Sequence, residues 1–162
     1  GLVIYLLDLN FTLVGNSAPH GTRPEPMAKR MKTEIYRQWL VEMLRPHDVI
    51  LITARPDRWK EPTMARIAEL TGWQPMDAYF DDGVTRTPPA IKRHILIDLI
   101  FPKYGRGDYY AIESNPKTRD VYACLGIPSV WVNKTGRALK DHRRQFRDLP
   151  TELPQVGLDL GA

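Results

Sequence analysis

The sequence is poor in the features that mark secreted, membrane or disulfide-rich proteins. Its single cysteine, Cys124, cannot form an internal disulfide bond, and we expect a reduced, structural thiol in a cytoplasmic protein. No apolar run approaches the ~20 residues that cross a bilayer, so we expect no membrane partner. The apolar start at residues 2–7 lacks the flanking features of a signal peptide. A length of 162 residues with 43% hydrophobic and 26% charged residues therefore predicts one soluble globular domain.

Other absences narrow the classes of function. No glycine-rich Gly-x-Gly-x-x-Gly or Walker-type loop follows any apolar run, which disfavours an unrelated doubly wound nucleotide-binding protein. His20 and His94 do not have the spacing of paired metal ligands. The net charge of +4 and the pI near 9.3 permit an anionic partner such as a nucleotide or nucleic acid.

Short apolar runs alternate with helical patterns along the chain. The runs predict strands at residues 2–7, 49–52, 77–80, 109–112 and 127–132. Apolar residues at helical spacing predict helices at residues 27–44, 61–70, 88–100 and 117–125, with Ile35 on the buried side of the first and Leu99 on that of the third. Residues 10–26 show no periodicity and predict a loop. This alternation predicts an α/β, Rossmann-like parallel sheet with helices on both faces. We expect a single domain over residues 1–162, with a core at 2–133 and a C-terminal extension at 134–162.

Polar clusters follow the predicted strands at the edge where parallel sheets bind ligands. The clusters are Asp8-Leu9-Asn10-Phe11-Thr12, Thr53-Ala54-Arg55, Lys92 on a helix, and Glu113-Ser114-Asn115. Together they offer a carboxylate nucleophile, groups that hold a phosphate, a cation and a second acid for a metal.

In order and strand context these clusters resemble the motifs of the haloacid-dehalogenase (HAD) phosphatases. Within that family, the segment Lys60-Glu61-Pro62-Thr63 and the helix from Lys92 to Pro102 are similar to the phosphatase domains of phage polynucleotide kinase/phosphatases. The resemblance covers roughly residues 2–133. It implies the HAD fold with a minimal cap, because the segment from Gly15 to Pro26 is too short for a large lid domain.

The resemblance also implies roles for single residues. Asp8 would be the nucleophile that forms an aspartyl-phosphate. Asp8 and the backbone carbonyl of Asn10 would bind Mg²⁺, and Glu113 would complete the metal shell directly or through water. This metal suits an all-oxygen site. The remaining implied roles concern the substrate: Thr53 and Ala54 would hold the phosphoryl group, Lys92 would pair with that group and with Asp8, and Arg55 would reach toward the substrate.

The sequence departs from the family pattern at two positions. Asn10 replaces the second Asp, the general acid/base, and an amide neither gives nor takes the proton that this role requires. Ser114 stands where many members carry a second acid. Asn10 has three explanations: a substitution made to trap a ligand, a natural departure in a slow enzyme, or the mark of a phosphate-binding pseudoenzyme.

The expected function is therefore a Mg²⁺-dependent phosphomonoester hydrolase acting on a nucleotide or a polynucleotide 3′-phosphate. The rival is a catalytically impaired module that binds a phosphorylated or nucleic-acid partner. Single residues also have purely structural interpretations: Thr53 as a helix cap, Arg55 as a surface ion pair, Lys92 as a solvated residue on a helix face, and Trp59 in packing instead of a nucleic-acid groove. The sequence does not fix the oligomeric state or the natural substrate.

Overall fold

The strand β1 (Ile4–Leu7) lies at the centre of a five-stranded parallel sheet in the computed structural model, which describes residues 3–18 and 25–132. The other strands are β2 (Asp48–Pro56), β3 (Asp77–Asp81), β4 (Tyr109–Glu113) and β5 (Ser129–Trp131). Their order in the sheet is β3-β2-β1-β4-β5. The predicted α/β, Rossmann-like architecture is therefore confirmed. The predicted C-terminal extension at 134–162 lies outside the described residues.

Both faces of β1 are covered, which explains why its sequence is continuously apolar. Tyr5, Leu6 and Leu7 are fully buried. Leu6 packs into one hydrophobic cluster, whereas Tyr5 and Leu7 pack into another on the opposite face. Because successive side chains of a strand point to opposite faces, only an unbroken apolar run can fill both clusters.

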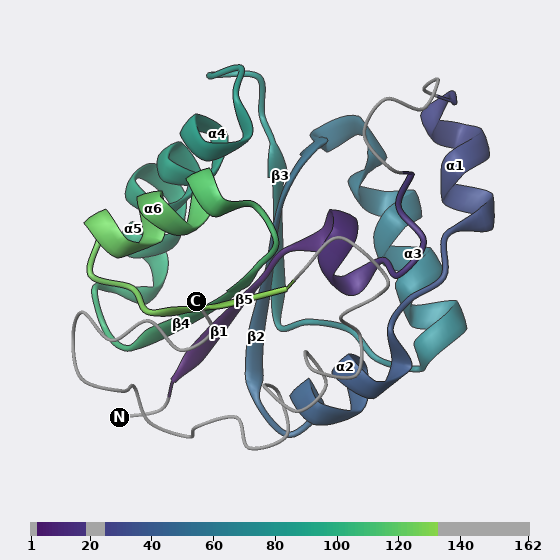
Figure 1. Ribbon diagram of the computed structural model, residues 1–162, viewed down its shortest axis with the longest axis horizontal. Coiled ribbons are helices and arrows are strands. Elements are labelled where there is room, and N and C mark those ends of the chain that lie inside the picture. The colour runs from purple at the N-terminus through teal and green to yellow at the C-terminus, as the bar shows by residue number, and fades with distance from the viewer. Residues whose placement is uncertain (1–2, 19–24, 133–162) are drawn as a thin grey trace.

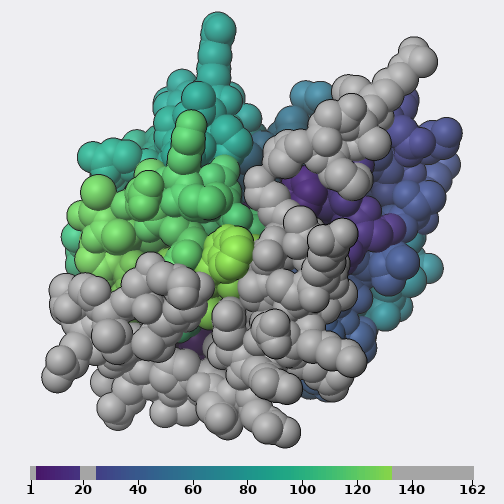
Figure 2. Space-filling model, viewed as in Figure 1, coloured from purple at the N-terminus to yellow at the C-terminus, as the bar shows by residue number. Residues whose placement is uncertain are grey.

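Helices cover the two faces of the sheet as separate layers (Figure 1). One layer contains α1 (Met27–Thr33), α2 (Gln38–Leu44) and α3 (Lys60–Thr71). The other contains α4 (Pro88–His94), α5 (Phe101–Tyr104) and α6 (Pro116–Cys124). Figure 2 shows the two layers as teal and green atoms on one side and blue atoms on the other. None of the described helices has the length and apolar character needed to span a bilayer.

The predicted single helix at 27–44 is wrong, because the chain leaves helical geometry between α1 and α2. Glu34 has an extended backbone, with φ −62° and ψ 136°, and Tyr36 forms an antiparallel bridge with Val14. Ile35, predicted to face the core, is 63% exposed. Arg37 accounts for part of the break, since its buried guanidinium donates to the backbone carbonyls of Phe11 and Thr12 instead of facing solvent.

Three other boundaries differ from the sequence prediction. β2 continues to Pro56, so Thr53-Ala54-Arg55 belongs to the strand, where pairing with β3 is irregular between Ile52 and Pro56. The predicted loop at 10–26 begins within a wide turn, Leu9–Leu13, in which the N–H groups of Leu13 and Val14 donate to the carbonyls of Asp8 and Leu9 although Asn10 and Phe11 have non-helical dihedrals. A π-helical segment, Ile95–Ile100, joins α4 to α5. The wider π turn shifts the buried face, and Leu99, predicted to be buried, is 36% exposed.

Candidate active site

The carboxyl ends of β1, β2 and β4 surround a pocket of about 180 Å³. β2 and β3 lie on one side of β1, and β4 and β5 lie on the other. The pocket therefore lies at the carboxyl end of β1, where the order of the strands in the sheet reverses. Eleven residues line the pocket: Asp8, Asn10, Phe11, Thr53, Ala54, Pro88, Lys92, Glu113, Ser114, Asn115 and Thr118. Six of the seven predicted site residues are among them, and Arg55 is not.

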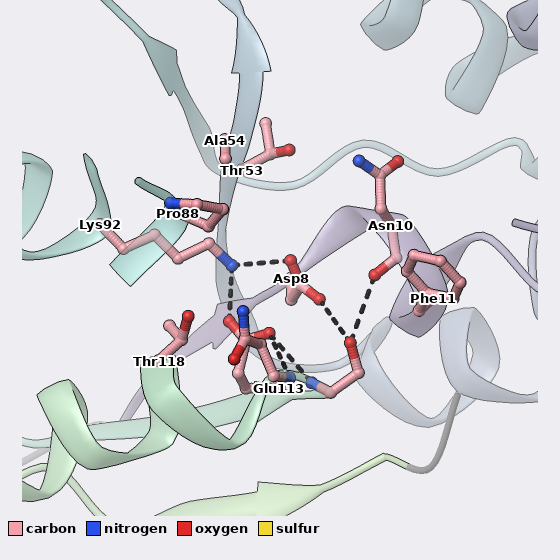
Figure 3. A pocket seen from close by; sticks show the side chains of 11 residues that line it. Asp8, Asn10, Phe11, Thr53, Ala54, Pro88, Lys92, Glu113 and Thr118 are labelled. Carbon is pink, nitrogen blue, oxygen red and sulfur yellow. Dashed lines mark hydrogen bonds and ion pairs between the residues drawn. The ribbon is translucent and has the colours of Figure 1, made fainter. Parts of the chain in front are cut away.

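Lys92 connects the two carboxylates at the floor of the pocket (Figure 3). Its Nζ donates to Asp8 Oδ1 at 2.6 Å and to Glu113 Oε1 at 2.5 Å. The side chain of Lys92 is only 3% exposed, although it extends from a helix on the outer layer. Burial alone would lower the pKa of Lys92, but the carboxylates of Asp8 and Glu113 raise it above its ordinary value. Lys92 therefore carries a full positive charge at neutral pH, and the alternative of a solvated surface lysine is wrong.

The three charges of this floor do not balance. Two carboxylates face one ammonium group, and all three side chains are almost fully buried. Burial and the neighbouring Asp8 raise the pKa of Glu113 to about 8, although Lys92 acts in the opposite direction. Buried acids hold protons when positive charge is insufficient. Additional positive charge in the pocket would therefore favour the ionised form of Glu113.

The turn after β1 fixes the direction of the Asp8 carboxylate. Thr12 Oγ1 donates to Asp8 Oδ2 at 2.7 Å across one turn of Leu9–Leu13. Phe11 has a φ of 62°, which non-glycine residues rarely adopt. Arg37 stabilises this strained turn, since its Nη1 donates to the carbonyls of Phe11 and Thr12 at 3.2 and 3.1 Å. The Asp8 carboxylate is consequently held in one orientation, with Oδ1 accepting from Lys92 and Oδ2 accepting from Thr12.

The oxygen atoms around Asp8 fit a hard cation such as Mg²⁺. The Ser114 hydroxyl donates to Asp8 Oδ2 at 3.2 Å and lies 3.5 Å from the carbonyl oxygen of Asn10, so both of these oxygens face the same hydroxyl. Mg²⁺ typically takes one or two carboxylates and several waters. No group of three His, Cys, Asp or Glu suited to a metal occurs in the described ranges.

Glu113 has little free capacity to bind a metal directly. Its Oε1 accepts from Lys92, and its Oε2 accepts from the backbone N–H groups of Ser114 and Asn115 at 3.0 and 3.1 Å. These bonds place Glu113 mainly as the partner of Lys92. Glu113 could contact Mg²⁺ directly or through a water molecule. Its hydrogen bonds favour contact through water.

Thr53 and Ala54 line the opposite wall of the pocket. Thr53 is 1% exposed, and its Oγ1 accepts from the backbone N–H of Arg55 at 3.1 Å within the irregular part of β2. An irregular strand pairing redirects side chains, here toward the pocket. Thr53 is thus a strand residue, and its interpretation as a helix cap is wrong.

Arg55 lies behind the pocket wall and not on the protein surface. Its side chain is fully buried and forms an ion pair with Glu34, at 2.6 Å between Nη2 and Oε2. The same Nη2 donates to Asn10 Oδ1 at 3.0 Å. The interpretation of Arg55 as a surface ion pair is therefore wrong, and among the residues that the structure describes its guanidinium reaches the pocket lining through Asn10.

Thr118 is a pocket residue that the sequence interpretation missed. It is fully buried in the first turns of α6, and its hydroxyl has no hydrogen-bond partner among the residues that the structure describes. Its position follows from Asn115, which caps α6 by accepting from the N–H of Lys117 at 2.9 Å. A helix that begins directly after Glu113 places its first inward side chain over the same pocket, and this spacing could have identified Thr118.

Solved structures of the Pnkp1/Rnl/Hen1 complex contain chains with this fold. One matches with a TM-score of 0.66 and 18% sequence identity, over 82% of this chain and 45% of the other. A second, a structure of the Pnkp1/Rnl/Hen1 RNA repair complex, matches with a TM-score of 0.62 and 19% identity, over 82% of this chain and 42% of the other. The present chain thus spans less than half of those chains, and the likeness shows the fold alone. No model of a protein family and no curated protein matches.

Proposed function

We propose that this chain is a Mg²⁺-dependent phosphomonoester hydrolase of the HAD type, with Asp8 as the nucleophile. The observation that carries the proposal is the Asp8–Lys92–Glu113 arrangement at the floor of a pocket at the strand-order reversal. Lys92 holds one oxygen of the Asp8 carboxylate beside the place where a phosphoryl group would enter.

The charges of the site agree with a phosphate ester as substrate. Because the pKa of Glu113 is raised to about 8, the floor of Asp8, Glu113 and Lys92 is neutral or negative, and it carries no net positive charge that could bind a phosphate dianion. Mg²⁺ bound by Asp8 and the Asn10 carbonyl would supply the missing positive charge and polarise the phosphoryl oxygens. The pocket volume of about 180 Å³ leaves room for a phosphate group with a few waters.

The protein residues then divide the work of the first step. A carboxylate oxygen of Asp8 bonds to phosphorus while the bond from phosphorus to the leaving oxygen breaks. Thr53 and the ammonium of Lys92 would hold the phosphoryl oxygens as charge moves onto them. In the second step, water attacks phosphorus and releases Asp8. Asn10 provides hydrogen bonds but no proton in either step, so this enzyme would be slow.

A nucleotide or a polynucleotide 3′-phosphate is the substrate class that we favour. The short 3₁₀ turn Asp57–Trp59 follows directly after β2, the strand that carries Thr53 and Ala54. Within it, the exposed Arg58 guanidinium lies 5.6 Å from the ring centroid of the partly exposed Trp59. A cation beside an aromatic ring suits phosphate and base contacts of a single strand. The RNA repair complex with the same fold supports this choice.

The test is phosphate release from a 3′-phosphorylated oligonucleotide, mononucleotides and sugar phosphates, with Mg²⁺ and with EDTA. We expect Asn10→Asp to be about 10²- to 10⁴-fold faster than the parent. Asp8→Asn should abolish release in both backgrounds. A preference for sugar phosphates would refute the proposed substrate.

The rival function is a binding module that holds a phosphorylated partner, and Asn10 and Ser114 are the observations that favour it. If neither the parent nor Asn10→Asp releases phosphate from any substrate of the panel, this rival replaces the hydrolase. Binding of the same 3′-phosphorylated oligonucleotide, measured by titration calorimetry with Mg²⁺, would then be expected to depend on Lys92.

A further inference from the structure

The pocket residue Asn10 is held from behind by a buried ion pair. Arg55 Nη2 donates to Asn10 Oδ1 at 3.0 Å. The same guanidinium donates to both carboxylate oxygens of Glu34, with Nη1 at 3.1 Å and Nη2 at 2.6 Å. A further bond joins Arg55 Nη1 to Thr63 Oγ1 at 3.0 Å. Each of these three partners comes from a different segment of the chain, so the guanidinium is fixed from several directions.

We propose that Arg55 and Glu34, here called the Arg55–Glu34 clamp, position the side chain of residue 10 and fix it as a hydrogen-bond donor toward the phosphoryl site. This inference rests on the proposed function and deepens it. A guanidinium has donors only, so the amide oxygen of Asn10 must face Arg55. The amide nitrogen then points away from the clamp, and in Figure 3 it lies on the side of Thr53.

The clamp is suited to holding this orientation. Arg55 has a fully buried side chain, and that of Glu34 is 6% exposed, so water does not compete for their bonds. The bidentate geometry of guanidinium and carboxylate restricts rotation of both groups. Glu34 also neutralises the charge of Arg55. The guanidinium can therefore orient the neutral amide of Asn10 without adding net charge to the pocket wall.

A fixed donor at position 10 has a specific chemical consequence. When the Asp8 oxygen bonds to phosphorus and the leaving oxygen departs, the Asn10 N–H can hydrogen-bond to that oxygen, but the proton must come from solvent water. When water later attacks the phosphoryl group on Asp8, no side-chain oxygen of residue 10 is available to accept its proton. The clamp therefore assists formation of the aspartyl-phosphate more than its hydrolysis, and phosphorylated Asp8 should accumulate.

A double-mutant cycle tests whether Arg55 acts through residue 10. The measured quantity is the rate at which acid-stable phosphate from a 3′-³²P-labelled oligonucleotide appears on the protein in a single turnover with Mg²⁺. Arg55→Lys keeps the positive charge opposite Glu34 but loses the planar guanidinium that binds Glu34 and Asn10 together. We expect it to slow this rate about 10-fold, the scale of one hydrogen bond. In an Asn10→Ala background the same change should alter the rate less than about 2-fold.

Controls separate positioning from general damage. Arg45→Lys alters an exposed arginine that pairs with Glu42 and should leave the rate unchanged. Equal slowing by Arg55→Lys in the parent and in the Asn10→Ala background would overturn the clamp, and so would no slowing in either. Should Arg55→Lys not unfold cooperatively, Thr63→Val replaces it in the cycle, because it removes one bond to the same guanidinium without touching a charge.

A second readout does not depend on activity. The side-chain NH₂ signals of Asn10, identified by their loss in Asn10→Ala, should be dispersed in the ¹H–¹⁵N spectrum of the parent and move toward free-amide positions in Arg55→Lys. Unchanged signals would refute the clamp. Absence of phosphorylated Asp8 in the parent, together with no phosphate release by Asn10→Asp, would instead refute the proposed function, so the two failures are distinguishable.

Discussion

Removal of the Lys92 ammonium should destabilise the folded chain strongly, and the size of the effect follows from the site. In Lys92→Met the two carboxylates of Asp8 and Glu113 lose their shared cation while they remain at most 9% exposed. Breaking a buried ion pair by removing one partner costs about 3–5 kcal/mol. Met preserves most of the aliphatic stem, so little of this loss would come from a cavity. The expected cost is a large fraction of the roughly 5–15 kcal/mol that stabilises a domain of this kind.

The assay is urea unfolding at neutral pH in EDTA, followed by circular dichroism, for Lys92→Met and for the double variant with Glu113→Gln. The amide introduced by Glu113→Gln can still accept from the N–H groups of Ser114 and Asn115, and it can donate toward Asp8. Because the pKa of Glu113 is raised to about 8 even beside Lys92, this acid is protonated at neutral pH in Lys92→Met, and Gln removes the cost of protonating it. We therefore expect the second change to restore at least about 2 kcal/mol of the loss. A cost below about 1 kcal/mol for Lys92→Met would refute the argument, because such a value is typical of a solvated lysine.

Three further predictions address the metal, the substrate and the pH dependence. Mg²⁺ at a hundredfold excess over its Kd should stabilise the parent by about 2.7 kcal/mol in thermal unfolding, and Asp8→Asn should lose this gain. Trp59→Ala should raise KM for a 3′-phosphorylated oligonucleotide by about 5- to 100-fold, the scale of base stacking, and leave KM for 4-nitrophenyl phosphate unchanged; equal changes for both substrates would exclude a stacking role. The carboxylates of Asp82 and Asp98 accept hydrogen bonds from the His94 ring and raise its pKa, so the stabilisation by His94 is complete below the ordinary pKa of about 6.5 and is lost as pH rises through the raised pKa. The melting temperature of the parent should therefore fall relative to that of His94→Gln as the pH rises above about 6.5, and parallel curves would contradict the assignment.

The sheet was predictable because its signal is local. The apolar run at β1 and the alternation of strands with helices depend on neighbouring residues, and the structure confirms them. The polar side chains at the strand ends were also predictable as a group, because parallel strands bring their carboxyl ends to one edge. Asp8, Lys92 and Glu113 meet there as the order of the motifs indicated.

The features that sequence reasoning missed depend on contacts between distant segments. The break after α1 follows from the bridge of Tyr36 to Val14 and from the bonds of Arg37 to the Leu9–Leu13 turn, and neither is visible in the helical spacing of residues 27–44. The place of Arg55 could not be read from its own motif either. It depends on Glu34, 21 positions earlier, which leaves the helical pattern to reach it.

The separation along the chain of the groups that meet at Asp8 has a consequence for biosynthesis. Lys92 lies 84 positions after Asp8, and Ser114 lies 106 positions after Asp8. The pocket therefore cannot form until β4 has paired with β1. At roughly 5–20 residues per second, a ribosome would add these partners about 5–20 seconds after Asp8. During that interval the edge of β1 that later pairs with β4 would be unpaired, and apolar side chains of β1 would be exposed. Exposed strands of this kind are the ones that chaperones protect. The central strand would thus be synthesised early, and the pocket around Asp8 would be completed only after β4 had been synthesised.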